Sequence, residues 1–179
     1  MDALEFNVSQ LLRQNIGAAL EEDIDADDAL PVEDVVIERI AGRATLTRTN
    51  FGILARVKLR ASLQLECDRC LEDYLAVLPV SFAEEYLPVI DVLTGRPVQS
   101  ERTDDTFFIS PNHIVDLTEA FRQHLLLSIP MHSVCREDCL GLCSICGVNK
   151  NSSSCACAEE SDSPFSAIAS LLTDSTLSN

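Results

Sequence analysis

The sequence predicts an α+β fold in which an antiparallel β-sheet with a few helices is followed by a cysteine-rich C-terminal segment. Three observations lead to this prediction. Residues 53–67 alternate between apolar and polar side chains, residues 116–130 have the pattern of a capped helix, and six of the eight cysteines fall within residues 135–157. A chain of 179 residues is long enough for one full domain with a small appendage, and too short for two large domains.

The predicted sheet extends over residues 35–87. Apolar residues stand at odd positions from 57 to 67 and polar ones at even positions from 56 to 66, which is the period of a strand with one buried and one exposed face. A turn signal at residues 49–52 precedes this strand, and residues 71–80 and 81–87 predict further strands. Near the N-terminus we expect a short strand at residues 4–8 and a helix that begins after Ser9.

Two segments are expected to be loops. Residues 21–34 hold eight acidic side chains and no basic one, which is typical of a solvated loop. Residues 91–106 are polar and contain proline and glycine, so they also predict a loop.

The most clearly marked helix is expected to begin at Asp116. This aspartate can cap the helix, Glu119 three residues later would complete a capping box, and Pro130 ends the pattern. After an acidic, serine-rich stretch, Ser163 and Pro164 have the pattern of an N-cap and first helical turn, so a last helix is expected to follow.

The cysteines indicate metal binding rather than disulfides. The N-terminus lacks the features of a secretory signal and no run of 18 apolar residues occurs, so we expect a cytoplasmic protein that is not in a membrane. Disulfides are rare in that reducing compartment. Residues 135–157 also show little apolar periodicity, and a bound metal ion would supply the stability that a small core cannot.

The spacing of the later cysteines predicts one structural zinc site formed by Cys143, Cys146, Cys155 and Cys157. A two-residue spacer lets the first two sulfurs point into one turn, and Gly147 frees the backbone to curl around them. The other four cysteines would form a second zinc site that ties the sheet to the tail: Cys67, Cys70, Cys135 and Cys139. For the Cys67 and Cys70 pair alone, core packing or a redox pair is the competing interpretation.

The order Cys139-x3-Cys143-x2-Cys146 also matches the spelling of a radical S-adenosylmethionine site. We reject that enzyme class because only 33 residues follow Cys146, too few for the barrel that such a site requires. An iron–sulfur cluster in place of zinc stays open at this point. The three domains that these patterns predict are an α+β domain over residues 1–134, the zinc-binding segment over 135–158, and a linker with a C-terminal helix over 159–179.

Charge is distributed unevenly along the chain. The net charge of −16 argues against indiscriminate nucleic-acid binding, yet residues 39–70 carry a local charge of +5. The candidate phosphate-contacting residues lie in this stretch: Arg43, Arg48, Arg56, Lys58 and Arg60. The competing interpretation is a solvated row that protects a sheet edge from pairing. No histidine stands in a nucleophile–base spacing and no phosphate loop is present, so an enzyme is not expected and neither is a small-molecule substrate.

With these residues in view, the sequence resembles the YceD family of bacterial and chloroplast proteins. The resemblance spans about residues 40–157 and rests on five segments: residues 46–54, Leu65-Glu-Cys-Asp-Arg-Cys-Leu-Glu72, residues 116–123, Leu127-Ser-Ile-Pro-Met131, and Cys139-Leu-Gly-Leu-Cys-Ser-Ile-Cys-Gly-Val-Asn149. It implies a non-enzymatic role in the synthesis, processing or stability of 23S ribosomal RNA, with ribosomal RNA or a pre-ribosomal particle as partner.

Two other functions are consistent with the residues alone. The acidic surface could hold a basic ribosomal protein before assembly, in which case the basic row would matter little. A thiol-based redox sensor would instead need exposed thiols of low pKa.

Overall fold

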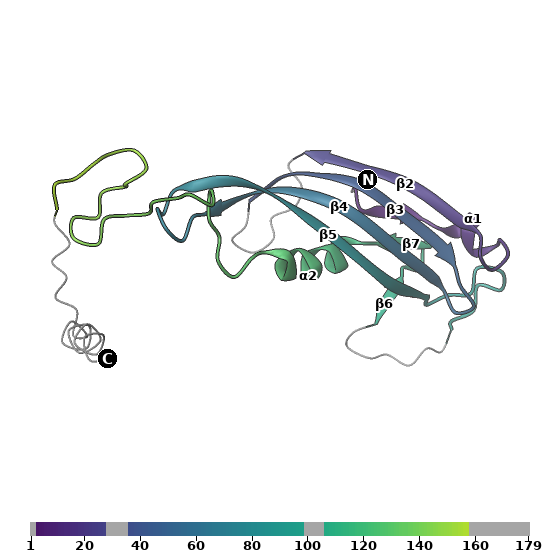
Figure 1. Cartoon of the computed structure of the whole chain (residues 1–179). Coiled ribbons are helices and arrows are strands. Elements are labelled where there is room, and N and C mark those ends of the chain that lie inside the picture. The colour runs from purple at the N-terminus through teal and green to yellow at the C-terminus, as the bar shows by residue number, and fades with distance from the viewer. Residues whose placement is uncertain (1–2, 28–35, 99–105, 158–179) are drawn as a thin grey trace, which may run out of the picture. The chain divides into compact units, whose positions relative to one another are not determined.

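The computed structural model describes residues 3–27, 36–98 and 106–157 (Figure 1). They form two compact units. The first contains the described residues up to 68 and from 72 to 135, and the second contains residues 69–71 and 136–157. The expected C-terminal helix after Ser163 lies outside the described residues.

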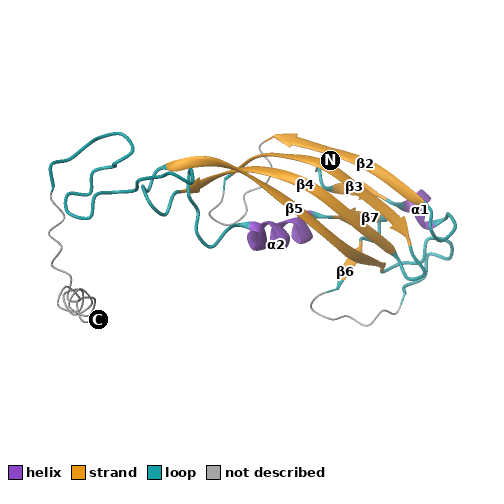
Figure 2. Ribbon diagram, viewed as in Figure 1, coloured by secondary structure: helices purple, strands orange, loops and turns teal. Residues whose placement is uncertain are grey.

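The first unit is built on a five-stranded sheet with the order β2-β3-β4-β5-β6 (Figure 2). Its strands are β2 (Ala19–Asp27), β3 (Ile37–Arg48), β4 (Ile53–Glu66), β5 (Asp73–Pro88) and β6 (Phe107–Ile109). All neighbours are antiparallel except β5 and β6. A second, two-stranded sheet pairs β1 (Glu5–Asn7) with β7 (Ile114–Asp116), and the helices are α1 (Ser9–Leu12) and α2 (Thr118–Ser128). The predicted antiparallel α+β fold is thus confirmed.

One face of the five-stranded sheet forms the core. Val57 and Leu59 of β4 and Val80 of β5 are buried together with Phe121 and Leu125 of α2, which packs against β5. Figure 1 shows α2 beneath the sheet. The alternation seen in the sequence arises because every second side chain of β4 enters this core.

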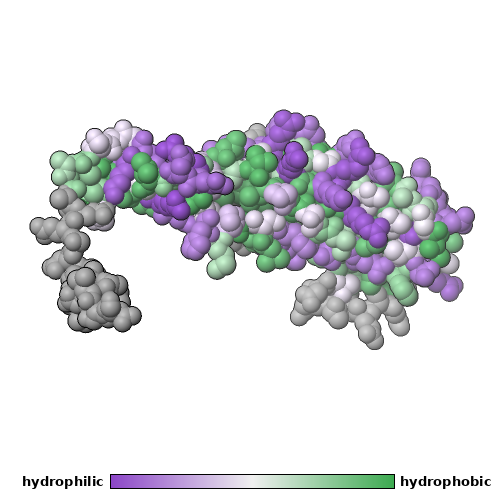
Figure 3. Space-filling model, in the orientation of Figure 1, coloured by the Kyte–Doolittle hydropathy of each residue, from purple (hydrophilic) through white to green (hydrophobic). Residues whose placement is uncertain are grey.

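The opposite face of the sheet is exposed, and we call it the outer face. Register places the polar side chains of β4 there, because Arg56, Lys58 and Arg60 are exposed while the residues between them are buried. Leu75 and Val77 of β5 are exposed hydrophobic residues. Figure 3 likewise shows hydrophobic side chains visible among hydrophilic ones on the surface of the protein.

The expectation of a loop over residues 21–34 is wrong for its first part, because residues 19–27 form β2. The acidic side chains on the outer face pair with arginines of β3: Arg39 contacts Asp25 at 2.8 Å and Arg43 contacts Asp23 at 2.8 Å. On the other face Ile24 is buried. These cross-strand pairs offset the repulsion that makes the acidic sequence look incompatible with a strand.

Helix α2 is shifted slightly from its expected start. Its N-cap residue is Leu117, and Asp116 Oδ1 accepts a hydrogen bond from the Thr118 N–H at 2.9 Å. Glu119 does not close a capping box but accepts hydrogen bonds from Arg122 and Gln123. Ile129 is extended, as expected for the residue before Pro130. Among the described residues, no helix is long and apolar enough to cross a membrane.

The second unit is organised by turns in its described part, residues 69–71 and 136–157. Leu142 and Asn149 form an isolated β-bridge, and the Lys150 N–H donates to the Gly141 carbonyl at 2.9 Å. Gly141 has a φ of +69° and lies so close to Arg69 that a side chain there would approach the Arg69 carbonyl oxygen within 2.9 Å. The glycine therefore permits the close contact between these two short segments.

Candidate metal centres

The structure gathers the eight cysteines into two groups of four. We call Cys67, Cys70, Cys135 and Cys139 the first quartet, and Cys143, Cys146, Cys155 and Cys157 the second quartet. In each quartet the four sulfur atoms lie within 4.8 Å of one another, so each quartet could hold a metal ion. These are the same two sets that the sequence predicts.

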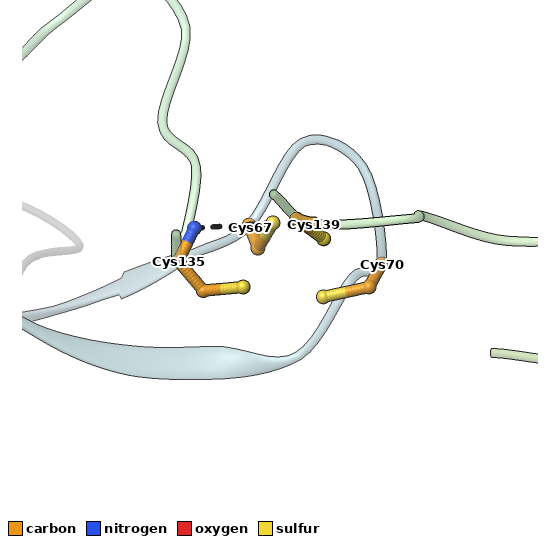
Figure 4. A group of neighbouring side chains, drawn as sticks. All are labelled: Cys67, Cys70, Cys135 and Cys139. Atoms are coloured by element: carbon orange, nitrogen blue, oxygen red, sulfur yellow. Dashed lines mark hydrogen bonds between the residues drawn. The ribbon is translucent and has the colours of Figure 1, made fainter. Parts of the chain in front are cut away.

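The first quartet draws on two stretches that are far apart in the sequence. Cys67 and Cys70 follow β4, and Cys135 and Cys139 follow α2. Figure 4 shows the four sulfurs turned toward one another. Cys67, Cys70 and Cys139 are buried, and Cys135 is partly buried.

The separations are compatible with tetrahedral coordination. Thiolates bind zinc at about 2.3 Å, and a tetrahedron with that bond length has edges of roughly 3.8 Å. Sulfur atoms within 4.8 Å of one another need only a small contraction to reach such edges. Four thiols this close without a cation would have to stay largely protonated, since four thiolates repel one another.

Backbone hydrogen bonds shape the turn of the first quartet. Asp68 and Ser133 are bonded twice: the Asp68 N–H donates to the Ser133 carbonyl at 2.7 Å, and the Ser133 N–H donates to Asp68 Oδ2 at 2.8 Å. The Cys135 N–H then points at Cys67 Sγ, 3.4 Å away (Figure 4). An N–H directed at a sulfur stabilises the thiolate form that a metal requires.

The second quartet lies within the second unit. The Cys143 N–H donates to the Val148 carbonyl at 2.8 Å, and the Gly147 N–H donates to the Cys143 carbonyl at 2.9 Å. Gly147 has a φ of +71°, a conformation that glycine adopts without strain. Cys143 is buried, whereas Cys146 and Cys157 are exposed.

Thiol acidity is uneven in the second quartet. Hydrogen bonds from the backbone N–H groups of Cys146 and Ile145, with further ones from neighbouring thiols, lower the pKa of Cys143 to about 6. The pKa of Cys157 is shifted in the opposite direction: its hydrogen bond with Cys146 raises it to about 12. A divalent cation bound by this quartet would replace the protons of its thiols.

Two positioning residues in the second unit were not predicted. Asn151 Nδ2 lies 3.3 Å from Cys139 Sγ, while Asn151 Oδ1 accepts the Leu140 N–H at 2.9 Å. The Arg69 guanidinium donates to the Cys139 carbonyl at 3.1 Å. Asn151 stands in the loop between Cys146 and Cys155, so one amide joins the loop of the second quartet to a sulfur of the first. The one signal in the sequence is the asparagine pair at 149 and 151.

The predicted phosphate-contacting residues are only partly brought together. Arg43 is paired with Lys58 in the register of β3 and β4, so it shares the outer face with Arg56, Lys58 and Arg60. Its guanidinium is bound to Asp23 and Glu21, which raise its pKa. Arg48 is separate: it is paired with the buried Ile53, and its Nη1 donates to the Gly52 carbonyl at 2.9 Å.

A histidine–carboxylate contact also lies outside the predicted sites. His124 Nε2 of α2 is 3.0 Å from Glu84 Oε1 of β5, and its ring stacks on Phe82 with centroids 4.9 Å apart. The hollow beside it has a volume of about 510 Å³ and includes Glu119 and Leu127. We assign this contact a packing role, since it joins α2 to β5.

These features define a class of protein: an α+β protein whose sheet is accompanied by two cysteine quartets, each able to hold a metal ion. Comparison with family models matches residues 55–172 to the family described as large ribosomal RNA subunit accumulation protein YceD. The chain belongs to the YceD family, as its sequence predicts. Comparisons with curated proteins and with solved structures returned no match.

The matched range contains all eight cysteines and the basic residues of β4. The family is named for the accumulation of large-subunit ribosomal RNA and not for a catalysed reaction.

Proposed function

We propose that this protein is a non-enzymatic, cytoplasmic factor in large ribosomal subunit biogenesis, where it supports the synthesis, processing or stability of 23S ribosomal RNA. The family match over residues 55–172 carries the proposal. The outer face supports it, because Arg56, Lys58 and Arg60 are exposed there and can contact phosphates of ribosomal RNA or of a pre-ribosomal particle.

The direct test is association with precursor particles. We expect the full-length protein to co-sediment with precursors of the large subunit, and cells that lack it to accumulate less 23S than 16S ribosomal RNA. Normal 23S levels without the protein, together with no association with such particles, would contradict the proposal.

We further propose that both quartets hold Zn²⁺ as a structural ion. Four thiolates within reach of a tetrahedron are typical of structural zinc sites, which have no open position for a substrate. Elemental analysis of the full-length protein should give about two zinc ions per chain. The Cys143→Ser, Cys146→Ser variant should retain the ion of the first quartet only. Iron and acid-labile sulfide in place of zinc would contradict this assignment.

A chaperone for a basic ribosomal protein is the second candidate function, and the acidic row of β2 favours it. Much of that row is engaged within the sheet, since Asp25 and Asp23 bind Arg39 and Arg43. If the chaperone function holds, salt should release a bound protein and charge changes on β4 should have little effect. A thiol-based redox sensor, the third candidate, would react with an alkylating reagent before any chelator is added.

A further inference from the structure

The outer face of the sheet is divided into parallel rows of different chemistry. The row on β2 is acidic: Glu21, Asp23, Asp25 and Asp27. The row on β3 contains Arg39 and Arg43, and the row on β4 contains Arg56, Lys58 and Arg60. The exposed row on β5 is small or apolar at Leu75, Val77, Pro79, Ser81 and Ala83, and the acidic Asp73 and Glu85 stand at its two ends. The outer face is therefore acidic on β2, neutralised by ion pairs on β3, basic on β4 and uncharged on the part of β5 opposite these cations.

The arginines of β3 are occupied by the acids of β2. Arg39 Nη2 lies 2.8 Å from Asp25 Oδ2 and its Nε lies 3.6 Å from Asp27 Oδ1. Arg43 makes the corresponding contacts with Asp23 and Glu21, at 2.8 and 3.4 Å. A phosphate that approached β3 would have to compete with these carboxylates.

The cations of β4 are accessible. Within the described part of the chain, no ion pair involves Arg56, Lys58 or Arg60. Their cross-strand partners on β5 are Ala83, Ser81 and Pro79, side chains too short to cover them. Successive cations on one face of a strand are about 6.7 Å apart. This spacing is similar to that between successive phosphates of an extended polynucleotide strand.

We infer that this row binds the backbone of a single-stranded RNA segment, with its bases lying over β5. The inference rests on the proposed function and specifies which form of RNA the outer face binds. Neighbouring strands are about 4.8 Å apart, so the acidic row of β2 runs about 10 Å from the basic row of β4. A duplex laid along β4 would place its second phosphate row over these acids or over the uncharged side chains of β5, and neither neutralises it.

The β5 side of the track suits unpaired bases. Leu75 and Val77 are 55% and 57% exposed, and β6 pairs with β5 only at residues 86–88. Among the described strands, the edge of β5 before Tyr86 therefore has no neighbouring strand, so bases can extend over the short side chains of Pro79, Ser81 and Ala83 opposite the cations, with Leu75 and Val77 further along the strand. The exposed row of β5 has no aromatic side chain for stacking, so we expect the track to tolerate any base sequence.

The test compares a 12-nucleotide oligouridine with a 12-base-pair RNA duplex, both labelled, by fluorescence anisotropy on the full-length zinc-bound protein. We expect the single strand to bind at least about tenfold more tightly than the duplex, with a slope of log K against log salt near −2 for three phosphate contacts. The Lys58→Gln, Arg60→Gln variant should lower that slope to about −0.7. The matched control Arg13→Gln, Arg96→Gln has the same net charge and should behave as the wild type.

A second variant tests the acidic flank. Asp23→Asn with Asp25→Asn removes the shorter ion pair of each β3 arginine and leaves only the longer contacts with Glu21 and Asp27, so duplex binding should rise by a larger factor than single-strand binding. Equal affinity for duplex and single strand, an unchanged slope in Lys58→Gln, Arg60→Gln, or displacement of RNA by equimolar polyglutamate would overturn the inference. If the wild type and the Lys58→Gln, Arg60→Gln variant co-sediment equally with precursor particles, the inference fails and the proposed function stands. If the wild type does not associate and 23S levels are normal without the protein, the proposed function fails.

Discussion

The amide of Asn151 illustrates how one side chain can serve a metal centre that its own loop does not form. It holds Cys139 Sγ through Nδ2, and Asn149 Oδ1 fixes that Nδ2 group at 2.9 Å. Hydrogen bonds to ligating sulfurs orient the ligand and favour its thiolate form. Asn151 therefore acts on the first quartet as a positioning residue.

Replacing Asn151 should weaken metal binding by the first quartet and leave metal binding by the second quartet unchanged. We expect Asn151→Ala to lower the zinc affinity of the first quartet about 10- to 100-fold, which is the usual cost of losing such a partner. Competition with a chromophoric chelator measures this: the variant should release the ion of the first quartet more readily than the wild type, and the ion of the second quartet equally. Ser153→Ala in the same loop is the control. Identical release curves for Asn151→Ala and Ser153→Ala would contradict the role.

At the scale of residues, the grouping of the cysteines could be predicted and the contacts that support them could not. Cysteine spacing alone indicated which thiols group together, because a two-residue spacer brings two sulfurs into one turn. The contact of Asn151 with Cys139 depends on how the loop from 147 to 154 folds back, and loop residues carry no periodicity to reveal it. Arg48 was grouped with the other basic residues because the face on which it lies depends on strand register. A register error of one residue moves a side chain to the other face, and the predicted turn at residues 49–52 does not fix the register to one residue.

At the scale of elements, Gly52, directly before β4, lies against the backbone of β5. A side chain there would fall onto the carbonyl oxygen of Tyr86 and within 3.0 Å of its carbonyl carbon. Gly52 is also fixed by Arg48, which binds its carbonyl, and by Thr49, whose Oγ1 accepts its N–H. The turn between β3 and β4 thus requires a residue without a side chain.

Gly52→Ala should therefore destabilise the sheet by about 2–4 kcal/mol, because strand backbone must shift to accommodate the methyl group. Urea unfolding followed by circular dichroism measures the change. In the control Gly17→Ala the added atom meets nothing within 4 Å, and only the φ of +88° is unfavourable, at about 1 kcal/mol. Equal losses of unfolding free energy in the two variants would show that the backbone shifts to accommodate the methyl group at position 52 without destabilising the sheet.

Helix α2 carries a pH-dependent contribution in its first turn. The Arg122 guanidinium, with Gln123, lowers the pKa of Glu119 to about 2 from its usual value near 4.5. A carboxyl whose pKa is lowered on folding stabilises the folded state above pH 4.5, and that contribution is lost as the pH falls toward 2. The pair is largely exposed, so we expect it to contribute at most about 1 kcal/mol.

Comparison of Glu119→Gln with the wild type isolates this contribution from any effect of acid on the cysteine quartets, which both proteins share. The free energy of unfolding of the wild type should exceed that of the variant above pH 5, and the difference should vanish near pH 2. Denaturant titrations at a series of pH values measure it, with Glu66→Gln as an exposed control. A difference that is constant with pH would exclude the ion pair as its source.

Strand β2 shows where reasoning about elements from sequence fails. Its acidic outer row suggested a loop, since like charges at every second position repel one another and strands are depleted in aspartate. The compensation comes from Arg39 and Arg43, which are more than ten residues away and contact the acids only once the strands have paired. By contrast, β4 could be predicted because its apolar residues are the ones buried in the core and its polar residues are the exposed ones. In β2, pairing with β3 overrides the low strand propensity of the local sequence, whereas in β4 local sequence pattern and tertiary packing favour the same structure.

For the molecule as a whole, the two units differ in what holds them together. The first has a core that includes Phe121, Leu125 and the inner residues of β4. In the described part of the second unit, the buried residues from 136 onward are Cys139, Gly141 and Cys143. So small a buried set cannot offset the entropy of ordering a segment of more than 20 residues. We therefore expect its order to depend on metal ions held by the quartets.

Removing zinc should consequently unfold one unit and leave the other folded. Hydrogen exchange after dialysis against a strong chelator should show loss of protection at the amides of Cys143 and Gly147, while amides of β3 and β4 stay protected, because binding free energy in the second unit is also its folding free energy. Re-addition of one equivalent of zinc per quartet should restore the protection. Cys143→Ser with Cys146→Ser should reproduce the loss around the second quartet without chelator. Undiminished protection at Cys143 and Gly147 in the metal-free protein would mean that the turns of this unit are stable through their own hydrogen bonds.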